Sequence, residues 1–365
     1  MKKFAVLNLV LVLSLLLGTA ALAQEGDFGV VQRTADTALD GWSPTISADA
    51  LYENLNDGDT SNDPFIVSVR APDAYAKGHI PGAINIPWTQ IAKPESLAML
   101  PTDQPIVVYC YTGHTGQVTA TVLNLLGYDV QNLKFGIMGW TLNDEVLGTT
   151  RFGPDTDARD YPLETTANEA TETYDYPTLD TGADDPTEIV RIAADTALDG
   201  WSPTISADAL FENLNDGDTS NDPVVVSVRA ADAYALGHIA GAINIPWNQI
   251  ATPENLAKLP PDQPIVVYCY TGHTGQVAAT VLKVLGYDVQ NLKYGMMGWT
   301  LDDEVLGTAR YDPATAPDYP VEGTAVEAPV TETPAPTPLP ETGGMGLPIE
   351  GILVGFGTLT AAAGV

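Results

Sequence analysis

Residues 106–116 read IVVYCYTGHTG: an apolar run, one cysteine, and a short loop that contains two glycines. The apolar run, residues 106–109, is typical of a strand that is buried on both faces of a sheet. Residues 117–126 have apolar side chains at positions 118, 122, 125 and 126, a spacing that predicts a helix. Cys110 is therefore expected at the carboxyl end of a strand, where the chain turns into a helix.

Elements on the amino-terminal side of this stretch alternate between helix and strand. Residues 46–51 predict the start of a helix capped by Ser47, and residues 56–58 predict its end. A buried strand is expected at residues 65–69, a helical turn at 74–77 and a further strand at 83–86. The alternation predicts an α/β domain in which helices flank a mostly parallel sheet.

The whole pattern occurs twice. Shifting the sequence by 159 residues aligns residues 34–150 with residues 193–309 without a gap, and 19 of the 117 aligned positions differ. The chain therefore contains two copies of one domain. Cys269 and the loop that follows it occupy, in the second copy, the place of Cys110 and its loop.

Two segments outside the copies have the composition of spacers. Residues 151–192 are expected to form an acidic linker, because their central part is rich in Asp, Glu, Thr and Pro and poor in apolar residues. Residues 310–338 contain a dense run of Pro and Thr and are expected to form an extended stalk. Because the linker has little to bury, each copy is expected to fold by itself.

Both ends of the chain have the features of export signals. Residues 1–23 contain two lysines, an apolar run and a final Ala-Leu-Ala, the pattern of a secretory signal peptide. Residues 339–365 begin with LPETGG and continue into a mainly apolar tail. They resemble a sortase signal, in which Thr342 is joined to the cell wall. We expect a secreted protein anchored to the cell surface, with sortase and cell wall as partners; a periplasmic or membrane-tethered protein is the alternative.

The charge of the chain is strongly negative. It has 15 Lys and Arg residues against 47 Asp and Glu residues, which gives a formal net charge of −32. A field of this sign repels nucleic acids and small anions, so we expect no nucleic-acid partner. The acidity is expected to keep the protein soluble.

The two cysteines of the chain are its candidate nucleophiles. Ligands of α/β sheets bind at the carboxyl ends of the strands, where the next helix offers free N–H groups and a positive dipole end that stabilise a thiolate. Gly113 and Gly116 would let backbone N–H groups turn towards the sulfur. An inert core cysteine is the alternative interpretation. A disulfide between Cys110 and Cys269 is not expected, because two equivalent strand ends would have to meet face to face.

Five motifs along each copy resemble those of a known family. They cover residues 46–148 and 205–307 and are similar to the rhodanese domain, the sulfurtransferase module. In the first copy the motifs are Val69-Arg70 with Asp73-Ala74-Tyr75, the stretch GHIPGAINIP at residues 78–87, Val107 to Cys110 with the loop, Gly127-Tyr128-Asp129-Val130, and Gly136 to Trp140.

The resemblance implies two rhodanese-like domains with Cys110 and Cys269 as catalytic residues. Each cysteine would take up a sulfane sulfur from a small donor as a persulfide and pass it to a thiol or another thiophilic acceptor, without a cofactor or metal. A non-catalytic surface module that binds a partner through the same pocket is the alternative. The residues expected to contact the substrate form the two loops: Tyr111, Thr112, Gly113, His114, Thr115, Gly116, Tyr270, Thr271, Gly272, His273, Thr274 and Gly275.

The loops depart from related enzymes in ways that bear on the substrate. Phosphatases that share this fold need an arginine at the sixth position after the cysteine to hold the phosphate, and here Gly116 and Gly275 stand there, which excludes phosphatase activity. Neither loop contains Arg or Lys, so persulfides or polysulfides are expected to be better donors than thiosulfate. Ser68 and Ser227 stand where family members usually have Asp, which is expected to change one local hydrogen bond.

The remaining polar residues of the motifs have alternative roles. The loop histidines His114 and His273 either support the thiolate or donate to the substrate, or else point into solvent. Arg70 is expected to form a structural ion pair with Asp73, as is Arg229 with Asp232, and not to bind substrate. His79 and His238 are expected to be structural hydrogen-bonding residues. The aromatic residues expected to anchor the core are Trp88, Trp140, Trp247 and Trp299.

Overall fold

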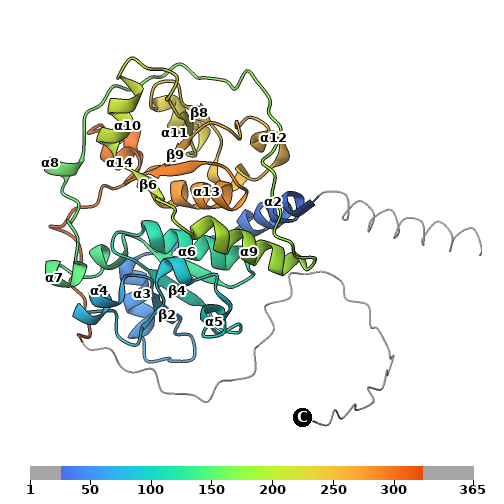
Figure 1. The fold of residues 1–365 in the computed structure, drawn as a ribbon. Helices are drawn as coiled ribbons and strands as arrows, with labels where there is room; N and C mark the ends of the chain where they lie inside the picture. Colours follow the sequence, from blue (N-terminus) through green and yellow to red (C-terminus); the bar gives the residue numbers. More distant parts are fainter. Residues whose placement is uncertain (1–25, 324–365) are drawn as a thin grey trace, which may run out of the picture.

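The computed structural model describes residues 26–323 as two five-stranded parallel sheets, one for each copy (Figure 1). The strand order is β1-β5-β4-β2-β3 in the first copy and β6-β10-β9-β7-β8 in the second, and every neighbouring pair is parallel. The predicted fold class is therefore confirmed. The strands are β1 (Thr45–Ile46), β2 (Phe65–Ser68), β3 (Ile84–Asn85), β4 (Ile106–Tyr109), β5 (Val130–Leu133), β6 (Thr204–Ile205), β7 (Val224–Ser227), β8 (Ile243–Asn244), β9 (Ile265–Tyr268) and β10 (Val289–Leu292).

Helices cover both faces of each sheet, because successive strand residues point to opposite sides. In β4, Ile106 and Val108 belong to the core that contains α6, whereas Val107 and Tyr109 belong to the core that contains α3. The helices of the first copy are α2 (Gly26–Leu39), α3 (Ala48–Leu55), α4 (Pro72–Lys77), the 3-10 helix η1 (Trp88–Gln90), α5 (Pro94–Leu97), α6 (His114–Leu125), the 3-10 helix η2 (Gly136–Gly139), α7 (Asp144–Leu147) and α8 (Pro154–Asp157). Those of the second are α9 (Pro186–Leu198), α10 (Ala207–Leu214), α11 (Ala231–Leu236), η3 (Trp247–Gln249), α12 (Pro253–Leu256), α13 (His273–Val284), α14 (Met296–Trp299) and α15 (Asp303–Leu306).

Several elements lie where the sequence predicts them. Strand β4 has the predicted bounds, and the Ser47 hydroxyl caps α3 by accepting a hydrogen bond from the Ala50 N–H at 3.1 Å. Helix α6 begins at His114 instead of residue 117, because Gly113 takes a left-handed conformation and forms its amino-terminal cap. Strands β1 and β5 and helices α2 and α9 were not expected. The spacing of Val31, Ala35 and Leu39 is a helical signal for α2.

The two copies pack against each other through helices. Helix α6 contacts α13 and α2 contacts α9, so these four helices form the layer between the sheets (Figure 1). The contacts are reciprocal: Gln32 of α2 donates to the Ala251 carbonyl at 2.7 Å, and Arg191, the equivalent residue of α9, donates to the Ala92 carbonyl at 3.2 Å. One continuous buried core contains residues of both copies. The expectation that each copy folds by itself loses its physical basis, because each copy covers apolar surface of the other.

The cysteine loops meet at the centre of this interface. The Nε2 atom of His114 accepts a hydrogen bond from the Tyr294 N–H at 3.1 Å, and Nε2 of His273 accepts one from the Phe135 N–H at 3.0 Å. The two imidazole rings are nearly parallel, with centroids 6.0 Å apart. Phe135 and Tyr294 have φ values of 65° and 66°, a conformation that is rare outside glycine. A strained backbone position in each copy is therefore held by the loop of the other copy.

The segment expected to be a linker is ordered against the second copy. Tyr161 stacks on Phe211 with ring centroids 4.0 Å apart, and Arg159 pairs with Asp208 at 2.6 Å. The backbone of Glu164 pairs with that of His238. The sequence expectation was wrong here because the segment is anchored by isolated aromatic and charged side chains and by backbone pairing, none of which raises its apolar content. Residues 158–168 are called the first arm below.

The start of the expected stalk packs on the first copy in the same way. Tyr319 stacks on Tyr52 with ring centroids 3.9 Å apart, and the backbone of Glu322 pairs with that of His79. The Trp140 indole donates to the Pro320 carbonyl at 2.9 Å. Residues 316–323, the second arm, therefore repeat the contacts of the first arm, and the segment after each copy covers the other copy (Figure 1).

The expected signal peptide, the rest of the expected stalk and the LPETGG segment with Thr342 lie outside the described residues. Within residues 26–323, none of the helices has the length and the apolar character needed to span a bilayer.

We predict that the two copies unfold as one cooperative unit. The full chain should give a single calorimetric transition, because the core and the arms are shared. A fragment of residues 26–153 lacks α9, α13 and the second arm, and should melt roughly 10 °C or more below the full chain. A fragment that keeps the melting temperature of the full chain, measured by circular dichroism, would contradict a shared core.

We predict a second, pH-dependent signature of the interface. Burial, with Lys293 as a smaller cause, lowers the pKa of His114 to about 3, and burial with His114 and Lys134 holds the pKa of His273 well below its usual range. The unfolded chain then binds more protons than the folded chain below about pH 6.5, so the free energy of unfolding should fall as the pH is lowered through this window, by up to about 1.4 kcal/mol per pH unit for each histidine. Above about pH 7 these two residues should contribute no slope.

Urea unfolding at several pH values between about 5 and 8 measures this slope. A His114→Gln/His273→Gln variant is the control, since the Gln side chain can still accept a hydrogen bond but does not titrate. An equal slope in the variant and in the parent would contradict the assignment.

Candidate active site

Both cysteines lie where a parallel sheet presents its carboxyl edge. Cys110 follows β4 and Cys269 follows β9, and both are free thiols that are 1% exposed. The Gly113 N–H points at the Cys110 sulfur with an N···S distance of 3.1 Å, and the Gly272 N–H makes the same contact with Cys269 at 3.1 Å. The expected hydrogen bond from the loop to the sulfur is therefore present in both copies.

Gly113 and Gly116 are required in the loop for different steric reasons. Gly113 has a φ of +91°, and a Cβ there would lie 2.4 Å from Nε2 of His273 in the other copy. Gly116 lies inside α6, where a Cβ would come within 2.3 Å of Oδ1 of Asn132. Only Gly113 donates to the sulfur among the described contacts. The expectation that Gly116 also does so is corrected: it makes room for Asn132.

Asn132 supports the cysteine loop through hydrogen bonds. Its Nδ2 atom donates to the Gly113 carbonyl at 2.9 Å and to Oε1 of Gln117 at 3.2 Å, and it is fully buried. Asn291 makes the equivalent contacts in the second copy. Sequence reasoning missed both residues. Strand β5 reads VQNL, so a second amide, Gln131, precedes Asn132, and no contrast with apolar neighbours marks Asn132 as a buried residue that needs specific partners.

The segment after β5 fixes the other side of the loop. The Ile137 N–H donates to the Cys110 carbonyl and the Met138 N–H donates to the Tyr111 carbonyl, each at 2.9 Å. This approach is so close that a Cβ on Gly136 would lie 2.5 Å from the Cys110 carbonyl oxygen. The cysteine backbone is therefore fixed by hydrogen bonds on both sides of the sulfur.

The loop histidines contact the opposite copy, a role that the sequence did not suggest. His114 and His273 are 4% and 3% exposed, so neither ring points into solvent. In His114, Nε2 accepts a hydrogen bond from the other copy, which assigns the proton of the neutral ring to Nδ1, 3.0 Å from Oγ1 of Thr112. Thr271 and His273 repeat the arrangement at 2.9 Å. Both ring nitrogens of each histidine therefore have protein partners.

The two sites differ in the aromatic pair beside the loop: Tyr294 packs on Phe152 at the Cys110 loop, and Phe135 packs on Tyr311 at the Cys269 loop. Burial raises the pKa of Tyr294, and Asp157 and Cys110 add to the rise, so the phenol stays neutral beside the Cys110 loop. The equivalent residue beside the Cys269 loop is Phe135, which has no hydroxyl group.

An open hollow adjoins each cysteine. The hollow at Cys110 has a volume of about 310 Å³ and that at Cys269 a volume of about 300 Å³. Both contain residues of the other copy: Pro203, Thr204 and Lys293 at Cys110, and Thr45 and Lys134 at Cys269. The loop residues expected to contact the substrate line the hollows in part, namely Tyr111, Thr112, His114 and Thr115 in the first and Tyr270, Thr271, His273 and Thr274 in the second.

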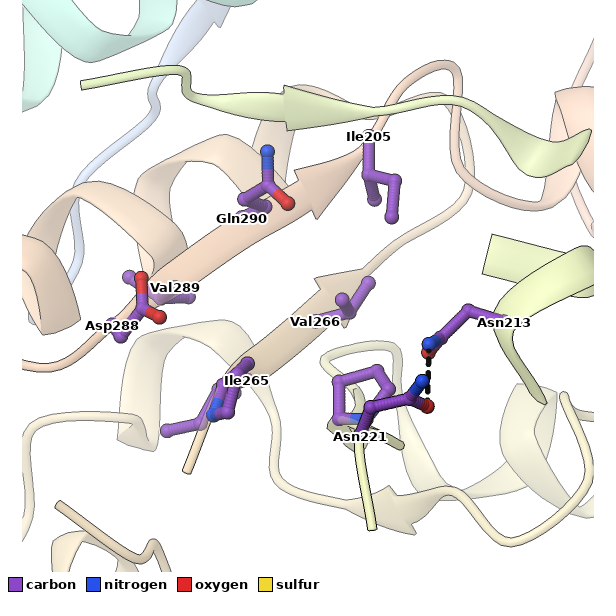
Figure 2. A pocket seen from close by; sticks show the side chains of 10 residues that line it. Ile205, Asn213, Asn221, Ile265, Val266, Asp288, Val289 and Gln290 are labelled. Atoms are coloured by element: carbon purple, nitrogen blue, oxygen red, sulfur yellow. Dashed lines mark hydrogen bonds between the residues drawn. The ribbon is translucent and has the colours of Figure 1, made fainter. Parts of the chain in front are cut away.

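Another hollow, of about 240 Å³, lies at the opposite end of the second sheet (Figure 2). It is lined by the amino ends of β9 and β10, including Ile265 and Val289, and by Asn213, which donates to Asn221 at 2.8 Å. It contains no cysteine, histidine or lysine. The candidate reaction sites are therefore the hollows beside Cys110 and Cys269, at the carboxyl edges of the two sheets.

Arg70 is structural, but not through the ion pair that the sequence suggested. It is fully buried and donates to the carbonyls of Val146 and Gly78 at 2.8 and 2.5 Å and to the Ser68 hydroxyl at 3.4 Å. Arg229 makes the equivalent contacts. The expected pairs with Asp73 and Asp232 are replaced because carbonyl oxygens inside the core surround the guanidinium group. The Ser68 and Ser227 hydroxyls accept hydrogen bonds from Nε of Arg70 and Arg229.

The other residues of the motifs stabilise the fold. His79 and His238 are buried, and Nδ1 of each contacts the carbonyl of a tyrosine one turn earlier, at 3.1 and 2.9 Å, which confirms their structural role. Trp140 and Trp299 are 1% and 2% exposed and anchor the core as predicted. Trp88 and Trp247, which were also expected to anchor the core, are only partly buried, and they pack against the core on the other face of the sheets. Among residues 26–323, no three His, Cys, Asp or Glu side chains gather as a metal site would require.

Comparison with known proteins agrees with this geometry. A family model described as "Rhodanese-like domain" matches residues 47–143 and 206–302. A sulfurtransferase of Allochromatium vinosum is 32% identical over 96 residues, which cover 26% of this chain and 85% of that protein. The probable adenylyltransferase/sulfurtransferase MoeZ of Mycobacterium tuberculosis is 33% identical over 109 residues, which cover 30% of this chain and 27% of that protein.

Among solved structures, a rhodanese-like domain protein from Staphylococcus aureus is 26% identical, with a TM-score of 0.25, and the match covers 27% of this chain and 91% of that chain. The matched regions of the family model contain both cysteines with their loops and together span more than half of the chain. The chain therefore belongs to the rhodanese-like domain family, with two copies of that domain in tandem.

Proposed function

We propose that the protein is a sulfurtransferase in which Cys110 and Cys269 each carry a sulfane sulfur as a persulfide. The observation that carries the proposal is the contact between the Gly113 N–H and the Cys110 sulfur at 3.1 Å, beside an open hollow, with the same contact at Cys269. The rhodanese-like domains and the sulfurtransferase relatives support a sulfurtransferase-type role.

The proposed reaction has two displacement steps. The cysteine thiolate attacks the outer sulfur of a donor R–S–S⁻, a new S–S bond forms, the bond between the two donor sulfurs breaks, and R–S⁻ leaves with that electron pair. An acceptor nucleophile such as a thiolate or cyanide then attacks the outer sulfur of the persulfide, and the cysteine leaves as thiolate. No net oxidation occurs and no proton is consumed, so neither step needs the loop histidines.

The backbone of the loop supports both charged states. The Gly113 N–H and the amino-terminal end of α6, a helix of 12 residues, place partial positive charge beside the sulfur. This charge stabilises the thiolate before the first step and the persulfide anion after it. Because Asn132 and the Ile137 N–H fix the loop on both sides, the donor groups need no reorganisation during the reaction.

The proposed place of action is the outside of the cell. The secretory pattern at residues 1–23 and the LPETGG segment at residues 339–344 support it. Both segments lie outside the described residues. Small extracellular persulfides or polysulfides as donors, and thiols as acceptors, complete the proposal.

We predict that replacing one cysteine halves the sulfur load. After exposure to a polysulfide donor, intact-mass analysis should find one added sulfur atom in Cys110→Ser or Cys269→Ser, two in the parent and none in the double variant. Stability should change by less than about 1 kcal/mol, because the serine hydroxyl can still accept from the glycine N–H. Cyanide should remove the added sulfur.

Two results would contradict this proposal. A double variant that still takes up sulfur would show that the cysteines are not the carriers. A parent that folds but gains no sulfur from any donor would favour the non-catalytic binding module instead.

We predict that surface attachment depends on Thr342. In a host that carries a sortase, the parent should appear in the cell-wall fraction with Gln24 as its first residue, whereas Thr342→Ala should not be joined to the wall. Fractionation and amino-terminal sequencing measure both outcomes. Equal wall attachment of Thr342→Ala would overturn the proposed anchor.

A further inference from the structure

Each active site lies next to a lysine from the other copy. Lys293 of the second copy lines the hollow at Cys110, and Lys134 of the first copy lines the hollow at Cys269. The loops themselves contain neither Lys nor Arg, which was the reason to expect thiosulfate to be a poor donor. That expectation loses its basis, because the cation is present at the site but comes from a distant part of the sequence.

The position of each lysine is fixed by the interface between the copies. Lys134 follows β5, and its N–H donates to the Ile46 carbonyl at 2.9 Å. The next residue, Phe135, donates its N–H to Nε2 of His273 at 3.0 Å. Lys293 and Tyr294 repeat this arrangement on His114. The hydrogen bonds that join the copies therefore also position each lysine beside the cysteine of the other copy.

These two lysines keep their charge available. Neither forms an ion pair with a carboxylate within the described part of the chain, although the protein has 47 acidic residues. Their Nζ atoms lie 5.3 and 5.1 Å from the ring centroids of Phe135 and Tyr294, a contact that orients a cation without neutralising it. Lys93, by contrast, pairs with Asp195 at 2.9 Å.

The charge of each lysine acts on the opposite loop. Lys293 contributes to the lowered pKa of His114, and Lys134 to that of His273. A cation that raises the energy of a protonated imidazole in the loop must lower the energy of an anion in the adjoining hollow.

We propose that Lys293 is the anion-binding residue of the Cys110 site and that Lys134 is the anion-binding residue of the Cys269 site, so that the charged group of an anionic sulfur donor is bound at each site by a cation that the other copy supplies. This inference rests on the proposed sulfur transfer. With thiosulfate, the cysteine thiolate attacks the sulfane sulfur, the S–S bond of thiosulfate breaks, and sulfite leaves with the electron pair. The lysine ammonium binds the sulfonate oxygens of the donor and of the departing sulfite.

Single-site backgrounds test the crossed arrangement. In Cys269→Ser, only the Cys110 site works, and Lys293→Gln should raise the KM for thiosulfate about tenfold in the presence of cyanide, while Lys293→Arg should restore part of the loss. In Cys110→Ser, Lys134→Gln should have the same effect. Loading from dimethyl trisulfide, an uncharged donor, should change less than twofold in each case.

Lys283→Gln is the matched control, because Lys283 is also partly buried in the second copy but lines neither active-site hollow. It should leave the KM for thiosulfate unchanged. An equal rise with Lys283→Gln, or no rise with Lys293→Gln and Lys134→Gln, would overturn the inference. A parent that loads from dimethyl trisulfide but not from thiosulfate would overturn it too and leave the proposed function intact, whereas loading from neither donor would remove both.

Thiosulfate binding can be measured independently of the sulfur-transfer reaction. In the Cys110→Ser/Cys269→Ser variant, thiosulfate should raise the melting temperature, and this rise should be lost when Lys134→Gln and Lys293→Gln are added. An unchanged thiosulfate-dependent rise in the lysine variants would show that the anion binds elsewhere and would overturn the inference.

Discussion

The hydrogen bonds that His114 and His273 accept from the opposite copy determine how the two domains are joined. Each bond ends on the N–H of a residue with positive φ, Tyr294 or Phe135, and each imidazole must stay neutral to accept it. Burial favours the neutral ring. The histidines that the sequence places beside the cysteines therefore belong to the interface between the copies as well.

The two sites resemble one another because the copies have the same loop sequence, and each hollow is lined by residues of both copies. The cysteine, the glycine donor and the supporting asparagine come from one copy, whereas Lys293 or Lys134 comes from the other. Both loops have the same residues, so most of the difference between the sites lies in the aromatic pair beside each loop, Tyr294 with Phe152 and Phe135 with Tyr311. The phenol is on opposite members of the two pairs.

The features that the sequence predicted correctly depend on residues close together within one copy. Strand β4, the cap at Ser47 and the burial of Trp140 follow from local periodicity and turn chemistry, and the position of Cys110 follows from them. Strands β1 and β5 and the support of the loop by Asn132 lie within one copy and were not predicted, but most of what the sequence did not predict depends on contacts between the copies. Helices α2 and α9, the ordered arms and Lys134 acquire their roles only when the copies pack together, and no spacing within one copy reports such a contact.

The exchange of the two arms has a topological consequence. The first arm covers the second copy and the second arm covers the first, so both docking positions are filled by the chain that creates them. The two copies are related by a pseudo-twofold rotation, as the subunits of a symmetric dimer are, although they belong to one polypeptide. A third copy added in series would find these arm positions and the α6 and α13 surfaces already occupied, so it could not join this pair through the same contacts, unlike a repeat added to an open solenoid stack.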